Sequence, residues 1–218
     1  MGERPGKDML CFDENALRQS LTGMAPALRL AFATAAAARQ LPAYEAFAER
    51  RKLPDIGRPR EVLEQLWEKV RLNGAAEDAW DGILDDIMDR IPAEDPDADG
   101  FIELMAQQAM SSLAYAIRCL LSAEAQEAAW AGLCEYEAAD QAAIKTLAID
   151  PGIPGAEAAI LSHDYVQRTL RVQLEAMALL DRDEIDALRA SSALLPTFTA
   201  DELARFAQAR VSASSAPC

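Results

Sequence analysis

Residues 26–40 read PALRLAFATAAAARQ, and this stretch decides the fold class. Only Arg29, Thr34 and Arg39 interrupt apolar side chains that would lie on every side of a helix. A helix that is apolar all round is buried on all sides, so it belongs in the middle of a bundle. We predict an all-α fold, a single multi-helix bundle with a central apolar helix at about 26–40.

The composition supports the same fold class. About one residue in five is alanine, whereas the 218 residues include only 10 glycines and 11 prolines. Helix periodicity, caps and proline breaks then predict further helices, and Thr199 with Glu202 forms a capping box before the last of them. The predicted helices cover about 13–22, 42–51, 59–72, 77–91, 101–121, 122–148, 156–180 continuing through a kink at 181–183 to 193, and 200–210.

The chain is long enough for one sizeable core and lacks a visible linker between two. We therefore predict a single all-helical domain over residues 1–211. The end of the chain, SASSAPC (212–218), has the composition of a disordered tail.

The acidic net charge argues against two classes of binding partner. The chain has 36 acidic and 21 basic residues and a net charge of −15, so its field repels phosphates and anionic headgroups. We expect no nucleic acid and no membrane among its partners, which leaves a protein partner or self-association. No apolar run is long enough to span a bilayer, and the start of the chain, MGERPGKDMLCFDEN, lacks the apolar stretch of a signal peptide. The four cysteines lack CxxC spacing, so we predict a cytoplasmic protein with reduced thiols.

Several segments resemble one family in the same order and with similar spacings. They are LAFATAAAARQLPAYEAF (30–47), VLEQLWEKV (62–70), ILDDIMDRIP with its acidic loop (83–99) and AIRCLLS (116–122). Together they resemble the YjaG-like family of uncharacterised bacterial proteins, a domain of unknown function, over about 20–190. The resemblance implies an all-helical bacterial cytoplasmic protein and no assigned activity. The helix after Thr199 and the tail depart from the family.

The acidic loop contains part of a calcium-binding pattern. Asp95, Asp97 and Asp99 occupy positions 1, 3 and 5 of an EF-hand loop, and Gly100 occupies position 6. Position 12 is Ala106 instead of the bidentate glutamate, and the next helix begins inside the loop at about Phe101. We interpret the three aspartates as a connector, with a calcium-binding module as an alternative.

Paired helix carboxylates suggest a second alternative, a magnesium-dependent nucleotide phosphohydrolase. The pairs are Glu61 with Glu64 and Asp86 with Asp89. At about 100° per residue, Glu61, Glu64, Glu68, Asp85, Asp86 and Asp89 all lie opposite the apolar stripes of their helices. We interpret them as solvated faces.

A single histidine limits the chemistry further. His163 alone cannot supply the two histidines of a di-iron bundle or a zinc protease. It shares a helical face with Val166 and Leu170, so we predict a hydrogen-bonded core histidine. Nothing in the pattern favours His163 as a base for Cys119 or Cys134.

No glycine-rich phosphate loop occurs in the sequence. We therefore predict a cytoplasmic helical protein-interaction or regulatory protein without catalytic activity, catalytic residues or a cofactor. The stripe Leu203, Phe206 and Ala207 must bury against its own core or against a partner, and the sequence leaves this choice open.

Overall fold

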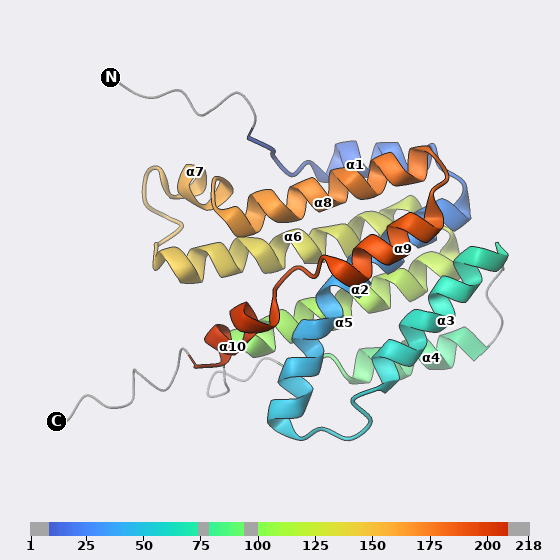
Figure 1. Ribbon diagram of the computed structural model, residues 1–218, viewed down its shortest axis with the longest axis horizontal. Coiled ribbons are helices and arrows are strands. Elements are labelled where there is room, and N and C mark those ends of the chain that lie inside the picture. The colour runs from blue at the N-terminus through green and yellow to red at the C-terminus, as the bar shows by residue number, and fades with distance from the viewer. Residues whose placement is uncertain (1–8, 74–78, 94–99, 209–218) are drawn as a thin grey trace.

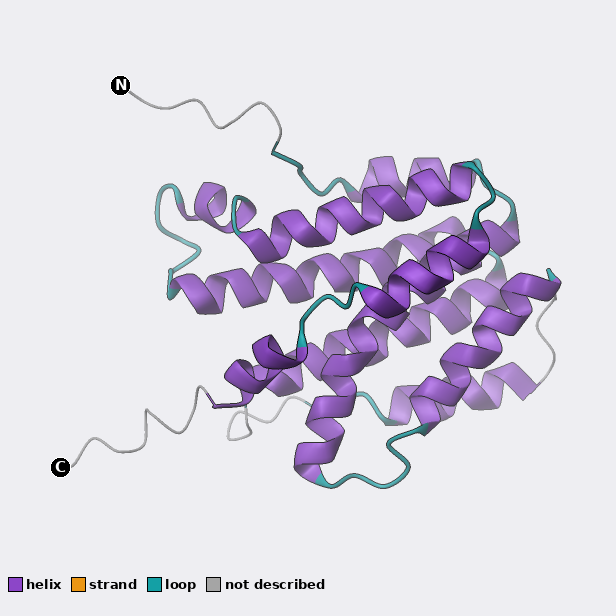
Figure 2. Ribbon diagram, in the orientation of Figure 1, coloured by secondary structure: helices purple, strands orange, loops and turns teal. Residues whose placement is uncertain are grey.

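The computed structural model describes residues 9–73, 79–93 and 100–208. These residues form ten helices and no strand (Figure 2). None of the helices combines the length and apolar character needed to cross a bilayer. Their bounds are α1 Glu14–Thr22, α2 Pro26–Arg51, α3 Arg58–Leu72, α4 Ala79–Asp89, α5 Phe101–Ser122, α6 Ala125–Leu147, α7 Ala156–Leu161, α8 Asp164–Asp181, α9 Ile185–Leu194 and α10 Ala200–Gln208.

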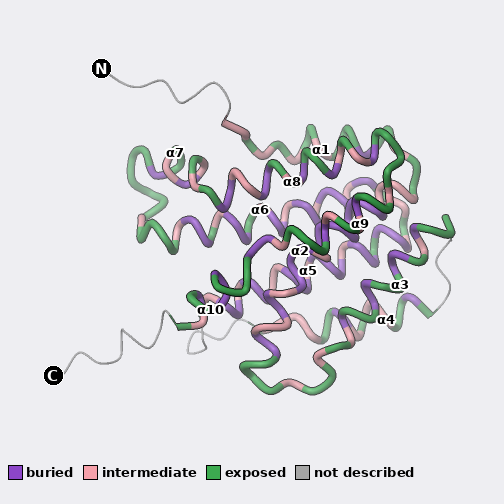
Figure 3. Tube along the Cα trace, in the orientation of Figure 1, coloured by how far each residue is buried: buried purple, intermediate pink, exposed green. Residues whose placement is uncertain are grey.

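Helix α2 is the centre of the bundle, as the sequence predicts. Every residue from Leu30 to Ala37 is buried. The helix packs against α3, α5, α6, α8 and α9 (Figure 1), and the buried part of the trace follows α2, α5 and α6 (Figure 3). The predicted all-α bundle with a central apolar helix is confirmed.

The predicted break at Pro42 is wrong, because α2 continues through it to Arg51. Proline removes one helix hydrogen bond and crowds the carbonyl four residues earlier. A neighbouring carbonyl, that of Arg39, accepts a hydrogen bond from the backbone N–H of Thr197 at 2.9 Å. Burial of Tyr44 and Phe47 beyond the proline also favours the continuous helix.

Two other predicted boundaries are wrong for local reasons. Ser122 ends α5 instead of capping α6, and Ala123 follows it in the left-handed conformation with φ of 57°. The predicted helix at 156–180 is divided into α7 and α8, because His163 leaves the helical conformation and caps α8. The predicted tail at 212–218 lies outside the described residues.

Helix α10 buries its apolar stripe against its own bundle, which settles the choice that the sequence leaves open. Leu203 and Phe206 are buried, and the Phe206 ring makes edge contacts with Phe101, Tyr165 and Phe198. The predicted capping box is present. Thr199 N–H donates to Glu202 Oε2 at 2.8 Å, and Glu202 N–H donates to Thr199 Oγ1 at 3.3 Å.

Replacing Thr199 with alanine should lower the free energy of unfolding by about 1 kcal/mol, because Glu202 N–H loses its capping acceptor. Urea unfolding followed by circular dichroism measures the loss, and amide exchange should quicken first in α10. Ser162→Ala is the control, since Ser162 Oγ donates only to a carbonyl in its own helix turn. Equal stability of the Thr199→Ala variant and the native chain would contradict the role of the cap.

Candidate functional site

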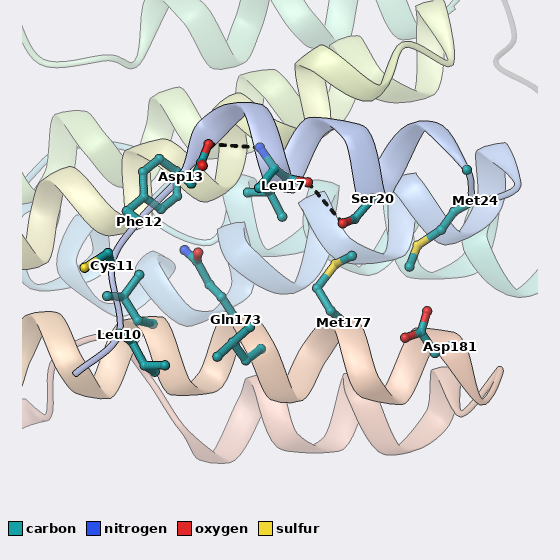
Figure 4. A pocket seen from close by; sticks show the side chains of 14 residues that line it. Leu10, Cys11, Phe12, Asp13, Leu17, Ser20, Met24, Gln173, Met177 and Asp181 are labelled. Atoms are coloured by element: carbon teal, nitrogen blue, oxygen red, sulfur yellow. Dashed lines mark hydrogen bonds between the residues drawn. The ribbon is translucent and has the colours of Figure 1, made fainter. Parts of the chain in front are cut away.

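A groove of about 650 Å³ runs between α1, with the segment leading into it, and one face of α8 (Figure 4). Its lining is mostly apolar. The first wall consists of Leu10, Cys11, Phe12, Asp13, Ala16, Leu17, Ser20, Gly23 and Met24, and the second of Leu170, Gln173, Leu174, Met177 and Asp181.

Helix α1 packs mainly against α6 and leaves the space beside α8 open. Asp13 starts α1 by accepting a hydrogen bond from Ala16 N–H at 3.0 Å. The segment before it is fixed as well. Gln167 exchanges two hydrogen bonds with the Leu10 backbone, at 3.0 and 2.9 Å, and the Phe12 ring stacks on Tyr136 at 4.6 Å. The N-terminal end of the first wall is therefore held in place.

The wall contributed by α8 has the spacing of a single helical face, from Leu170 through Leu174 and Met177 to Asp181. It spans about 16 Å along the helix axis, which is about three turns. Leu174 is 55% exposed. The buried residues of α8, in contrast, face the core. Leu174 adjoins the other apolar side chains that line the groove, and a contiguous exposed apolar patch is typical of a binding surface.

A buried ion pair lies beneath the groove. Glu135 of α6 is fully buried, and Arg39 of α2 donates two hydrogen bonds to its carboxylate at 2.6 and 2.7 Å. Gln173 Nε2 donates to the same carboxylate at 3.1 Å and to the Gly132 carbonyl at 2.9 Å, and Thr197 Oγ1 donates at 3.2 Å. Both carboxylate oxygens of Glu135 thus have two donors, so the charge is fully hydrogen-bonded.

The comparison with protein families covers most of the chain. The model of a protein family of unknown function, DUF416, matches residues 16–194. The chain belongs to the DUF416 family. No curated protein matches the chain. A solved structure of a DUF416 family protein from Shewanella baltica is similar, with a TM-score of 0.67, 16% identity, and coverage of 80% of this chain and 92% of that one.

At this identity the DUF416 structure shows the fold alone. The DUF416 match includes all of the α8 wall and most of α1, whereas Leu10 to Asp13 precede it and α10 follows it. The narrower resemblance to YjaG-like proteins stays a prediction.

The structure places the predicted carboxylates on exposed or half-buried helix faces, and arginines pair with four of the six. Asp86 accepts hydrogen bonds from Arg58 and Arg90, each at 2.9 Å. Burial by itself raises the pKa of Asp86, but these two arginines outweigh it and hold that pKa below its usual value. Glu64 pairs with Arg189.

Two further glutamates of these helix faces also pair with arginines. Glu61 pairs with Arg58 and Glu68 pairs with Arg71. Within residues 9–73, 79–93 and 100–208, no group of three or more histidine, cysteine or acidic side chains could hold a metal ion. Asp95, Asp97 and Asp99 lie outside the described residues, so their role as a connector stays a prediction.

His163 is not the predicted core histidine. It is half-buried at the N-cap of α8, where its Nδ1 accepts a hydrogen bond from Tyr165 N–H at 3.2 Å. Burial raises the pKa of Cys119 and of Cys134 to about 12. Because the thiolate is the nucleophile, neither thiol is suited to catalysis near neutral pH.

The sequence does not predict the groove. Leu10 and Phe12 precede the first predicted helix and carry no periodicity, and Leu174 and Met177 look like ordinary core positions of α8. Arg39 and Glu135 do carry a signal, since each is a charged residue within an alanine-rich helix.

Proposed function

We propose that this DUF416 protein is a non-catalytic interaction protein of the bacterial cytoplasm that binds a basic amphipathic helix of a partner protein between α1 and α8. The observation that carries the proposal is the apolar groove with the exposed Leu174 on its wall. The unpaired cysteines of the described residues, Cys11, Cys119 and Cys134, support a reducing compartment. The similar structure is that of a bacterial protein, which supports a bacterial source for this chain as well.

The shape of the groove favours a helix as its occupant. Both walls are helical, and the α8 wall is about three turns long. A helix in this position would add one more member to a helical bundle, with its apolar face inward. Met24 and Met177 suit such a role, because unbranched methionine side chains adapt to the shape of a partner.

Charge favours a basic partner. The exposed carboxylates of Asp13 and Asp181 line the groove, and the whole chain carries −15. A second copy of this acidic chain, or an anionic amphiphile, would meet repulsion there. A helix with lysine or arginine beside its apolar stripe would meet attraction.

Binding should be measurable through Cys11, the exposed thiol in the groove. In a Cys218→Ser background, a thiol reagent should modify Cys11 slowly when a lysine–leucine amphipathic peptide of about 14 residues is present. Leu174→Gln should weaken binding of that peptide about tenfold, because the buried apolar contact is lost. Fluorescence anisotropy of labelled peptide measures the affinity.

Leu194→Gln is the matched control, since Leu194 is 78% exposed on α9 and does not line the groove. It should leave the affinity unchanged. Equal affinities of the two variants would show that the peptide binds by charge elsewhere and would refute the proposal. Protection of Cys11 by apolar small molecules but not by the peptide would also refute it.

A further inference from the structure

Gln173 is a largely buried polar side chain in the lining of the groove. It projects from α8 between Leu170 and Leu174, and only 5% of its surface is exposed. Figure 4 shows the side chain extending from α8 with the amide at its tip, and the hydrogen-bond partners of that amide lie on α6. A partner that fills the groove would therefore cover this amide.

The orientation of the amide is fixed from below. Gln173 Nε2 donates to the Gly132 carbonyl at 2.9 Å and to Glu135 Oε2 at 3.1 Å, so both of its hydrogens are used. Turning the amide over would place its oxygen against these two acceptors. Arg39 donates two hydrogen bonds to Glu135 and holds its carboxylate in position, so a reversed amide would bring two acceptor oxygens together.

The other end of the amide remains available to a ligand. Gln173 Oε1 accepts no hydrogen bond from the residues that the structure describes, and it is not among their fully enclosed polar atoms without a partner. An apolar ligand group placed over this oxygen would remove it from water and leave it unpaired, whereas an N–H or O–H donor would satisfy it.

We infer that Gln173 determines the specificity of the groove, with its Oε1 selecting a partner that carries a hydrogen-bond donor within its apolar face. Tryptophan fits this requirement, since it combines a large apolar surface with a single N–H donor. The inference rests on the proposed function, because it names which helix the same groove prefers.

Two peptides that differ in a single hydrogen-bond donor test the inference. Both are basic and amphipathic, and the central apolar residue is tryptophan in one and naphthylalanine, which has a similar shape and no N–H, in the other. The native protein should bind the tryptophan peptide about tenfold more tightly, since the second peptide buries Oε1 without a partner.

Gln173→Met should abolish this preference, because methionine has a similar length and offers no comparable acceptor. The matched control is Thr197→Val, which also removes one hydrogen bond to Glu135 but lies outside the groove. Thr197→Val should keep the preference. The ratio of the two peptide affinities is independent of any shared loss of stability, provided that circular dichroism shows both variants folded.

Equal binding of the two peptides by the native protein would overturn the inference and leave the proposed function standing. A preference that survives in Gln173→Met, or disappears in Thr197→Val, would also overturn it. Failure of both peptides to bind or to protect Cys11 would overturn the proposed function and the inference with it.

Discussion

Replacing Arg39 with methionine should lower the free energy of unfolding by about 3–5 kcal/mol, because it leaves the Glu135 carboxylate buried without its counter-charge. Methionine approximates the arginine stem, so little packing volume is lost. Gln173 and Thr197 would still donate to Glu135, but both are neutral. Urea unfolding monitored by circular dichroism measures the change.

The matched control is Arg60→Met on the same bundle. Arg60 also donates two hydrogen bonds to one carboxylate, that of Glu45, at 2.7 Å each, but its side chain is 51% exposed. The loss there should be at most about 1 kcal/mol. A loss of this small size for Arg39→Met would show that Glu135 takes up a proton or reaches water, and would contradict the described burial.

A double variant separates the cost of leaving Glu135 without its counter-charge from the cost of losing the ion pair itself. Arg39→Met combined with Glu135→Leu should recover most of the lost stability, because a buried ion pair replaced by apolar side chains is often as stable as the pair. Recovery should be incomplete, since Gln173 and Thr197 would lose the acceptor that they share.

The ion pair joins distant parts of the chain beneath the groove. Arg39 lies on α2, Glu135 on α6 and Gln173 on α8, while Thr197 belongs to the segment between α9 and α10. Arg168 donates to the Thr197 carbonyl at 2.8 Å and to Glu202, so α10 is attached to the same network. This network explains why α10, which follows the DUF416 match, packs on its own bundle.

The sequence patterns correctly predicted the features that depend on residues close together in the chain. The stripes of α3 and α4, the Asp13 cap and the Thr199 capping box all depend on neighbours within about one or two helical turns. Pro42 misled the prediction because the burial of Tyr44 and Phe47 beyond it, which is decided by tertiary packing, favours a continuous helix despite the lost hydrogen bond. His163 misled it because a polar residue on an apparent apolar face can also be a cap.

The groove could not be predicted from the same patterns. It exists because α1 packs on α6 instead of closing against α8, and the sequence of either helix alone does not fix that distance. Leu174 and Leu170 lie on the same face of α8, yet the first is 55% exposed and the second is buried. Helical periodicity assigns both leucines to one face, so the difference in their exposure is a tertiary property.

Replacing Phe32 with alanine should lower the free energy of unfolding by about 3–5 kcal/mol, because the ring is fully buried in the central helix and its loss leaves a cavity. The variant Leu174→Gln should change stability by no more than about 0.5 kcal/mol, since its side chain lies on the exposed wall of the groove. Urea unfolding of both variants measures the contrast. Similar losses would show that the groove wall belongs to the core.

Gly132 provides a sharper test of the packing around Phe32. A Cβ atom at Gly132 would lie 3.1 and 3.3 Å from two atoms of the Phe32 ring and 3.2 Å from Leu17. The helix gains stability from alanine in place of glycine, but here the ring must give way. Gly132→Ala should therefore be more favourable in the Phe32→Ala background than in the native chain, by about 1 kcal/mol. Additive effects of the two substitutions would mean that the ring does not pack on the Gly132 backbone, and would place the junction of α1, α2 and α6 differently from this structure.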